Sequence, residues 1–179
     1  IAEITIPASV TTIESEAFAN CENLKTVNLL GDSITIEDNA FMNSPIENFD
    51  FDKASGRIWQ RSFKNSNLTG VVFPATVTEI SYGAFENSKY LEEVDFPETI
   101  ITLDPDAFEG TPWYENVYNE LDDGWVIYDN IFLGYKGDFS KIKDTAPILP
   151  EGVTSIVSDS MQYASFSSIT LPKSLKVIG

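Results

Sequence analysis

A phenylalanine recurs every 22 or 23 residues between residues 18 and 108, each time preceded by an alanine or a serine. The five copies are Phe18, Phe41, Phe63, Phe85 and Phe108. A regular period of this size is typical of solenoids, in which one repeat is too small to bury its own apolar face and must stack on its neighbours. The chain is therefore predicted to be a tandem array, whose first five repeats begin at Ile1, Leu24, Ile46, Leu68 and Leu91.

Other columns of the repeat predict its local structure. β-Branched and aromatic residues dominate the fourth and sixth positions, as in Ile4 and Ile6, and this spacing favours a short strand with one buried face. The thirteenth position is always Ile or Leu, and we expect it to make a further inward contact. Asparagine holds position twenty in four repeats and a small residue holds position twenty-one. We interpret the asparagines as a side-chain ladder that bonds buried carbonyls, and a plain row of surface turns is the alternative.

Three segments carry a resemblance to a known family. ITIPASVTTIESEAFANCENL at 4–24 is echoed by VVFPATVTEISYGAFENSKYL at 71–91 and by ILPEGVTSI at 148–156. This pattern resembles the BspA-type leucine-rich repeats of bacterial and protist surface proteins. The resemblance implies a β-rich α/β repeat solenoid, a leucine-rich-repeat superhelix with a parallel sheet on one face and short helical or irregular segments on the other. It also implies a binding or adhesion module.

The repeat register fails after residue 111. We predict repeats 1–5 over 1–111, an insert over 112–143, and repeats 6 and 7 over 144–179 with the last truncated, all in one continuous solenoid domain. PWYENVYNEL begins with proline at a plausible first helical position and predicts a short helix. WVIYDNIFLGYKG has two apolar runs around Asp129 and Asn130, which predicts a β-hairpin with a two-residue turn.

The insert is the most aromatic part of the chain, and two interpretations of it stay open. Its apolar residues are spaced to be covered, which favours a small satellite core that fills the gap between the fifth and sixth coils. Similar inserts in relatives of the family, matching Thr111, Pro112 and Trp113, favour the same interpretation. Alternatively, Trp125 and Tyr128 form a flat platform that stacks on sugars or contacts a protein.

Composition excludes several function classes. The 179 residues include 28 Asp and Glu against 11 Lys and Arg, a net charge of −17 that repels nucleic-acid phosphates and anionic lipid. There is no histidine, which removes the usual general base and the commonest metal ligand. A single cysteine excludes an internal disulfide, and no apolar run is long enough for direct membrane insertion. No phosphate loop or dinucleotide fingerprint is present, so we expect no enzyme, no catalytic residue, no metal and no cofactor.

The candidate binding residues follow from the strand alternation. If positions four and six point inward, positions three, five and seven point outward, and they include Asp50, Asp52, Glu93 and Asp95. An open sheet face does not desolvate a carboxylate as general-acid catalysis requires. A weak Ca²⁺ site is an alternative, although no acidic loop has the spacing of a calcium loop. We predict that these four acids steer a basic or cation-bridged partner.

We therefore expect a non-enzymatic protein–protein or adhesion recognition module of a bacterial cell-surface protein, located outside the cell or at its surface. Its partner is an unidentified protein or glycan. The chain starts on a core isoleucine and ends within a seventh repeat, so we expect signal and anchor segments outside it. The alternatives are a carbohydrate-binding module that uses Trp125 and Tyr128, and a structural spacer.

Overall fold

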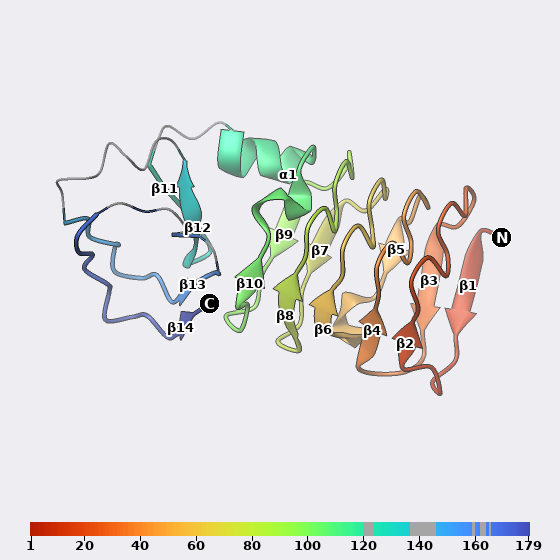
Figure 1. The fold of residues 1–179 in the computed structure, drawn as a ribbon. Coiled ribbons are helices and arrows are strands. Elements are labelled where there is room, and N and C mark those ends of the chain that lie inside the picture. The colour runs from red at the N-terminus through yellow and green to blue at the C-terminus, as the bar shows by residue number, and fades with distance from the viewer. Residues whose placement is uncertain (120–123, 137–145, 159, 162–163, 165) are drawn as a thin grey trace.

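The computed structural model describes residues 1–119, 124–136, 146–158, 160–161, 164 and 166–179. Each of the first five repeats forms one coil that contains two short strands (Figure 1). The strands at positions three to six pair in parallel with the equivalent strands of the next coil, and they form two sheets in the orders β1-β3-β5 and β7-β9. Their bounds are β1 Glu3–Ile6, β3 Thr26–Leu29, β5 Asn48–Phe49, β7 Gly70–Val72 and β9 Glu93–Asp95.

A second set of strands forms a continuous five-stranded parallel sheet around position thirteen, in the order β10-β8-β6-β4-β2. These strands are β2 Thr12–Ile13, β4 Ile34–Ile36, β6 Ala54–Ile58, β8 Val77–Ile80 and β10 Thr102–Leu103. The predicted parallel-sheet solenoid is confirmed. However, a side of the coil where we expected helical or irregular backbone is also a sheet, because the Ile column at position thirteen pairs from coil to coil.

Helical segments are short. They are the 3-10 turns η1 Phe51–Lys53 and η2 Pro105–Phe108, the α-helical turn α1 Pro112–Tyr114, and the π-helical turn η3 Glu115–Asn119. The predicted helix of the insert is thus present as α1 and η3. Thr111 caps it, because its Oγ1 accepts the Tyr114 N–H at 3.1 Å, and Pro112 occupies the first helical position.

The phenylalanine column forms the centre of the core. Successive rings from Phe18 to Phe108 stack with centroids 5.1–5.4 Å apart, and the rings from Phe41 onward are fully buried. The backbone beside them also pairs between coils: the Phe63 N–H donates to the Ala84 carbonyl at 2.8 Å. The backbone is left-handed two residues before and two residues after Phe63, at Arg61 (φ 51°) and Asn65 (φ 61°). This conformation lets the N–H groups of alternate residues point toward the next coil.

The two polar columns have different roles from those predicted. Asn43 Nδ2 donates to Asn20 Oδ1 at 2.9 Å and Asn65 Nδ2 donates to Asn43 Oδ1 at 2.6 Å, so the asparagine ladder exists, but it lies on the surface. The buried carbonyls are bonded instead from position twenty-one. Ser44 Oγ donates to the Phe18 carbonyl at 2.6 Å and accepts the Cys21 N–H at 2.9 Å. The column next to the asparagines therefore points inward and carries the internal hydrogen bonds.

Replacing Ser44 with alanine is expected to lower the free energy of unfolding by about 1–3 kcal/mol, because two backbone groups lose their partner at a fully buried position. Urea unfolding followed by circular dichroism measures this change. The control is Asn43→Gly on the exposed ladder, because Asn43 has a left-handed backbone (φ 60°) that glycine adopts without strain, and stability is expected to change by less than about 1 kcal/mol. A larger loss for Asn43→Gly than for Ser44→Ala would contradict the assignment of the internal ladder.

The insert contains the predicted hairpin. Strand β11 (Gly124–Tyr128) pairs antiparallel with β12 (Ile131–Lys136), and the turn residues Asp129 (φ 45°) and Asn130 (φ 66°) are both left-handed, as a type I′ turn requires. β12 then pairs in parallel with β13 (Ser155–Ile156), which pairs with β14 (Val177–Ile178). These four strands form the sheet at the C-terminal end (Figure 1).

β12 lies between two apolar clusters. Ile131 and Leu133 belong to the core of the first five coils, whereas Phe132 packs in a second cluster with Leu149, Val153 and Ile156. Alternation along the strand explains this arrangement, because neighbouring side chains of a strand point to opposite faces. The hairpin is thus packed against the solenoid. The last two residues of the predicted helix segment PWYENVYNEL, 120 and 121, lie outside the described residues.

Candidate functional site

The four predicted acids are all exposed, but they lie on two kinds of backbone. Glu93 and Asp95 stand on β9, as predicted, and their outward positions flank the buried Val94. In the third coil, by contrast, strand β5 ends at Phe49. The placement of Asp50 and Asp52 on a strand was therefore wrong.

Local hydrogen bonding explains this difference. Asp50 Oδ1 accepts the Asp52 N–H at 3.2 Å, so Asp50 caps the 3-10 turn η1 and the strand cannot continue. Phe51 turns inward and is 5% exposed, which keeps its ring in the core although its backbone has left the sheet. The carboxylate that caps this turn and the carboxylate of Asp52 consequently both face solvent.

This turn coincides with a break in the sheet. Among the strands that the structure describes, β5 pairs with β3 and β7 pairs with β9, and the ladder does not run from β5 to β7. Gly70 stands at the start of β7, and a Cβ built on it would have only Glu93 atoms within 4 Å. Because the chain leaves the sheet after β5 and Gly70 at the start of β7 has no side chain, space remains on the sheet surface beside β7.

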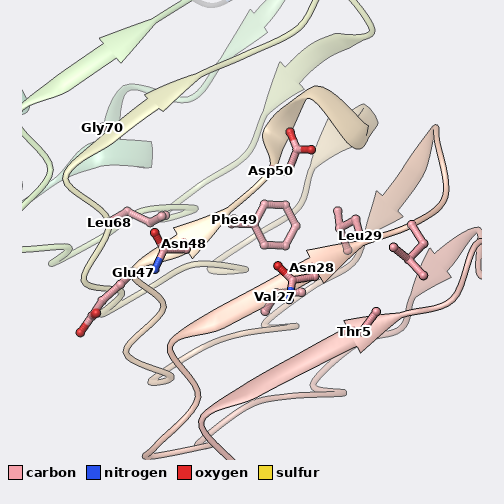
Figure 2. A pocket seen from close by; sticks show the side chains of 11 residues that line it. Thr5, Val27, Asn28, Leu29, Glu47, Asn48, Phe49, Asp50, Leu68 and Gly70 are labelled. Atoms are coloured by element: carbon pink, nitrogen blue, oxygen red, sulfur yellow. The ribbon is translucent and has the colours of Figure 1, made fainter.

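An open hollow of about 740 Å³ occupies the face beside this break (Figure 2). Its polar lining comes from successive coils and includes Thr5, Asn28, Asn48 and Asp50, with Phe49 and Gly70 at the break. A second hollow of about 230 Å³ shares Phe49, Asp50 and Gly70 and adds Asp52 and Val72. Among the described residues, Asp50 is therefore the one acidic residue that lines both hollows.

The electrostatics of this face are dominated by unpaired carboxylates. In the described part of the chain, none of Asp50, Asp52, Glu93 and Asp95 forms an ion pair. The adjacent Lys53 bonds Asp32 Oδ1 instead, at 2.5 Å. That hydrogen bond and the charge of Asp32, with smaller contributions from Asp50 and Asp52, raise the pKa of Lys53, so its ammonium stays charged. The two nearest acids remain available to an incoming cation.

The described residues contain no cluster of three or more acidic, cysteine or histidine side chains arranged to hold a metal ion. They also contain no helix that is both long and apolar enough to cross a bilayer.

The alternative site residues of the insert are half-buried among other rings. Trp125 packs edge to face with Phe132 and Tyr135, at centroid distances of 5.4 and 5.3 Å. Tyr128 packs in the same manner with Trp113 at 5.2 Å and with Phe96 at 6.1 Å. The two rings therefore pack in different clusters: Tyr128 lies against the core of the first five coils, and Trp125 lies against the second cluster, around Phe132.

The sequence analysis did not identify Arg57 and Arg61, which both stack on aromatic rings, as candidate binding side chains. Arg57 stacks over Trp59 at 4.5 Å and forms an ion pair with Glu79, while Arg61 stacks over Tyr82 at 5.0 Å. These are the only two arginines of the chain. The segment RIWQR at 57–61 places both arginines close to Trp59 in the sequence and could have indicated this site. The stacking of Arg61 on Tyr82 could not be predicted in this way, because Tyr82 belongs to the next coil.

Known proteins share this architecture. The family described as BspA type leucine rich repeat region matches the chain in six copies, over residues 1–114 and 129–179. No curated protein matches the chain.

Solved structures share the fold. A leucine-rich repeat protein from Bacteroides ovatus is 22% identical with a TM-score of 0.58, and the match covers 96% of this chain and 51% of that one. A leucine rich cell surface protein from Faecalibacterium prausnitzii is 23% identical with a TM-score of 0.53, covering 64% and 30%. The pneumococcal vaccine antigen PcpA is 18% identical with a TM-score of 0.51, covering 97% and 61%.

The chain thus spans about a third to three fifths of the length of these neighbours. Its five stacked coils with a phenylalanine column, its short parallel strands and the six matched repeats all lead to one conclusion. The chain belongs to the BspA-type leucine-rich repeat family.

Proposed function

We propose that this chain is a non-enzymatic recognition module of a cell-surface protein, and that it binds a partner protein through the acidic sheet face, defined by Asp50, Asp52, Glu93 and Asp95. The observation that carries the proposal is the position of these exposed carboxylates, none of which forms an ion pair with a described residue. Asp50 and Asp52 line the hollows at the β5–β7 break, and Glu93 and Asp95 stand on β9, the strand that pairs with β7. The surface location is supported by the neighbour from Faecalibacterium prausnitzii, which is named a cell surface protein.

The chemistry of the face favours a basic partner. A lysine or arginine side chain can enter the larger hollow and meet the Asp50 carboxylate together with the amide oxygens of Asn28 and Asn48. The net charge of −17 extends the attraction beyond these contacts and accelerates encounter with a basic surface. Because the carboxylates are exposed, their main contribution is to association rate, and salt weakens it.

We expect the double substitution Asp50→Asn with Asp95→Asn to slow association with a basic partner by roughly 2- to 30-fold at low salt, since an exposed ion pair contributes about 0.2–1 kcal/mol. The chain is screened by surface plasmon resonance against immobilised extracellular proteins that span acidic to basic isoelectric points. Association rates with the basic binders are then compared at low and high salt. The difference should shrink toward 1 M salt, where the Debye length is about 3 Å.

The matched control is Glu14→Gln with Glu16→Gln, which removes the same charge from two exposed acids outside the face. An equal effect of the two double variants would mean that only net charge matters. Loss of binding on Trp125→Ala or Tyr128→Ala, with the Asp50 and Asp95 variant unchanged, would move the site to the insert.

A further inference from the structure

A separate hollow lies at the turns that lead into β7 and β9. It measures about 230 Å³ and is lined by Asn65, Ser66, Asn67, Asn87, Lys89 and Tyr90. None of these residues belongs to the acidic sheet face. Its volume is below the roughly 300–1,000 Å³ of pockets that enclose drug-sized molecules, which limits an occupant to about one small ring.

The hollow occurs where the asparagine ladder stops. Between the first three coils, each asparagine donates its amide to the one before it, from Asn43 to Asn20 and from Asn65 to Asn43. Asn87 does not continue the series, because its Nδ2 donates to Glu86 Oε1 at 3.2 Å. Asn65 Oδ1 is therefore left without a hydrogen-bond donor from the described residues.

The length of the fourth repeat supplies the rest of the lining. The third repeat, 46–67, has one residue between its small residue Ser66 and the next repeat, whereas the fourth repeat, 68–90, has two. The additional residue places both Lys89 and Tyr90 in this turn, and Tyr90 is 58% exposed. An aromatic face thus stands beside the amides at the point where the ladder is interrupted.

The unsatisfied groups define the chemistry of an occupant. Within the described structure, the amide of Asn67 and the ammonium of Lys89 have no side-chain hydrogen bond or ion pair. Amides both donate and accept, so they match hydroxyl groups, and an exposed phenol ring packs on the C–H face of a sugar. Lys89 disfavours a cation, and the net charge of −17 disfavours an anion.

We propose that this hollow is a subsite for one neutral sugar residue of a glycan, a hexose or an N-acetylhexosamine. Tyr90 stacks on the ring, the Asn65 and Asn67 amides bond its hydroxyls, and Lys89 donates to a further oxygen. This site is independent of the proposed protein recognition by the acidic sheet face, and either proposal can fail without the other.

The test is an NMR titration of the ¹⁵N-labelled chain with the methyl glycosides of mannose, galactose and N-acetylglucosamine at millimolar concentrations. At least one glycoside is expected to shift the side-chain amide signals of Asn65, Asn67 and Asn87 in a saturable manner. Tyr90→Ala should weaken this binding by about three- to tenfold, the contribution expected of one aromatic face, and Asn67→Ala should weaken it as well.

The matched controls are Tyr82→Ala, another exposed tyrosine, and Asn23→Ala, an exposed asparagine in the corresponding turn of the first repeat. Both should bind as the unmodified chain does. The proposal is overturned if none of the glycosides shifts these amides, if Tyr90→Ala binds unchanged, or if the shifts gather at Trp125 and Tyr128 instead.

Discussion

Replacing Phe63 with alanine is expected to lower the free energy of unfolding by about 3–5 kcal/mol, the usual range for a buried aromatic side chain lost from a core. Its ring is fully buried and stacks on Phe41 at 5.3 Å and on Phe85 at 5.4 Å. Phe49 and Phe51 contact it from the strand side, at 5.0 and 5.1 Å. Because hydrogen bonds on several sides fix the spacing of the coils, the cavity cannot close readily.

Equilibrium unfolding in urea, followed by tryptophan fluorescence and circular dichroism, measures this loss. The control is Val72→Ala at an aliphatic residue that is 61% exposed, and it should change stability by about 0.5 kcal/mol or less. A loss below about 1 kcal/mol for Phe63→Ala would mean that the phenylalanine column does not carry the core.

Trp113→Ala is expected to have an effect of similar size, about 3–5 kcal/mol. Trp113 is 2% exposed and continues the aromatic column beyond the fifth coil, with its centroid 4.8 Å from Phe108. It also contacts Phe96 at 5.6 Å and Tyr128 of the hairpin at 5.2 Å. Its removal should therefore loosen the hairpin from the solenoid as well as lower global stability.

Urea unfolding gives the stability, and limited proteolysis of the native protein reports cleavage within 124–136. Trp59→Ala is the matched control, because this half-buried tryptophan stacks on Arg57 at the surface, and such a contact contributes about 0.5–1 kcal/mol. Faster cleavage of the hairpin is expected only for Trp113→Ala. Equal losses for the two variants, or rapid cleavage of the unmodified hairpin, would contradict its docking through Trp113.

The stability and recognition predictions concern different surfaces of the coil. The inward columns tolerate little change because they are shared between neighbouring coils, whereas the outward positions of the strands and the turn lengths can vary without disturbing the stack. The two sites proposed for this chain both arise from such local variation. One follows from the Asp50 cap that ends β5, and the other follows from the single extra residue that presents Tyr90.

The register of the solenoid was predictable from the sequence because burial leaves little choice. Each column must face the same column of the next coil, and a slip of one residue would expose the whole set. Accordingly, Ile4 pairs with Val27 and Ile13 pairs with Ile36, the partners that the repeat period predicts. The hairpin turn was also predictable, because Asp129 and Asn130 tolerate the left-handed backbone that a two-residue turn requires.

Other features depend on contacts between coils and could not be predicted from one strand's pattern. The second sheet consists of strands of two to five residues, too short for an alternation to be recognised, and its hydrogen bonds exist only once coils stack. The choice of Ser44 rather than Asn43 as the internal hydrogen-bonding side chain depends on which turn residue points inward.

The sequence by itself therefore determined the repeat register, the buried columns and the exposure of the four acids, because periodic burial fixes the direction of each side chain. Tertiary structure alone decided where the sheet face breaks, since the Asp50 cap competes with strand pairing and its outcome depends on the neighbouring coils. It also decided that β12 lies between two cores, because Phe132 and Leu133 find partners far away in sequence.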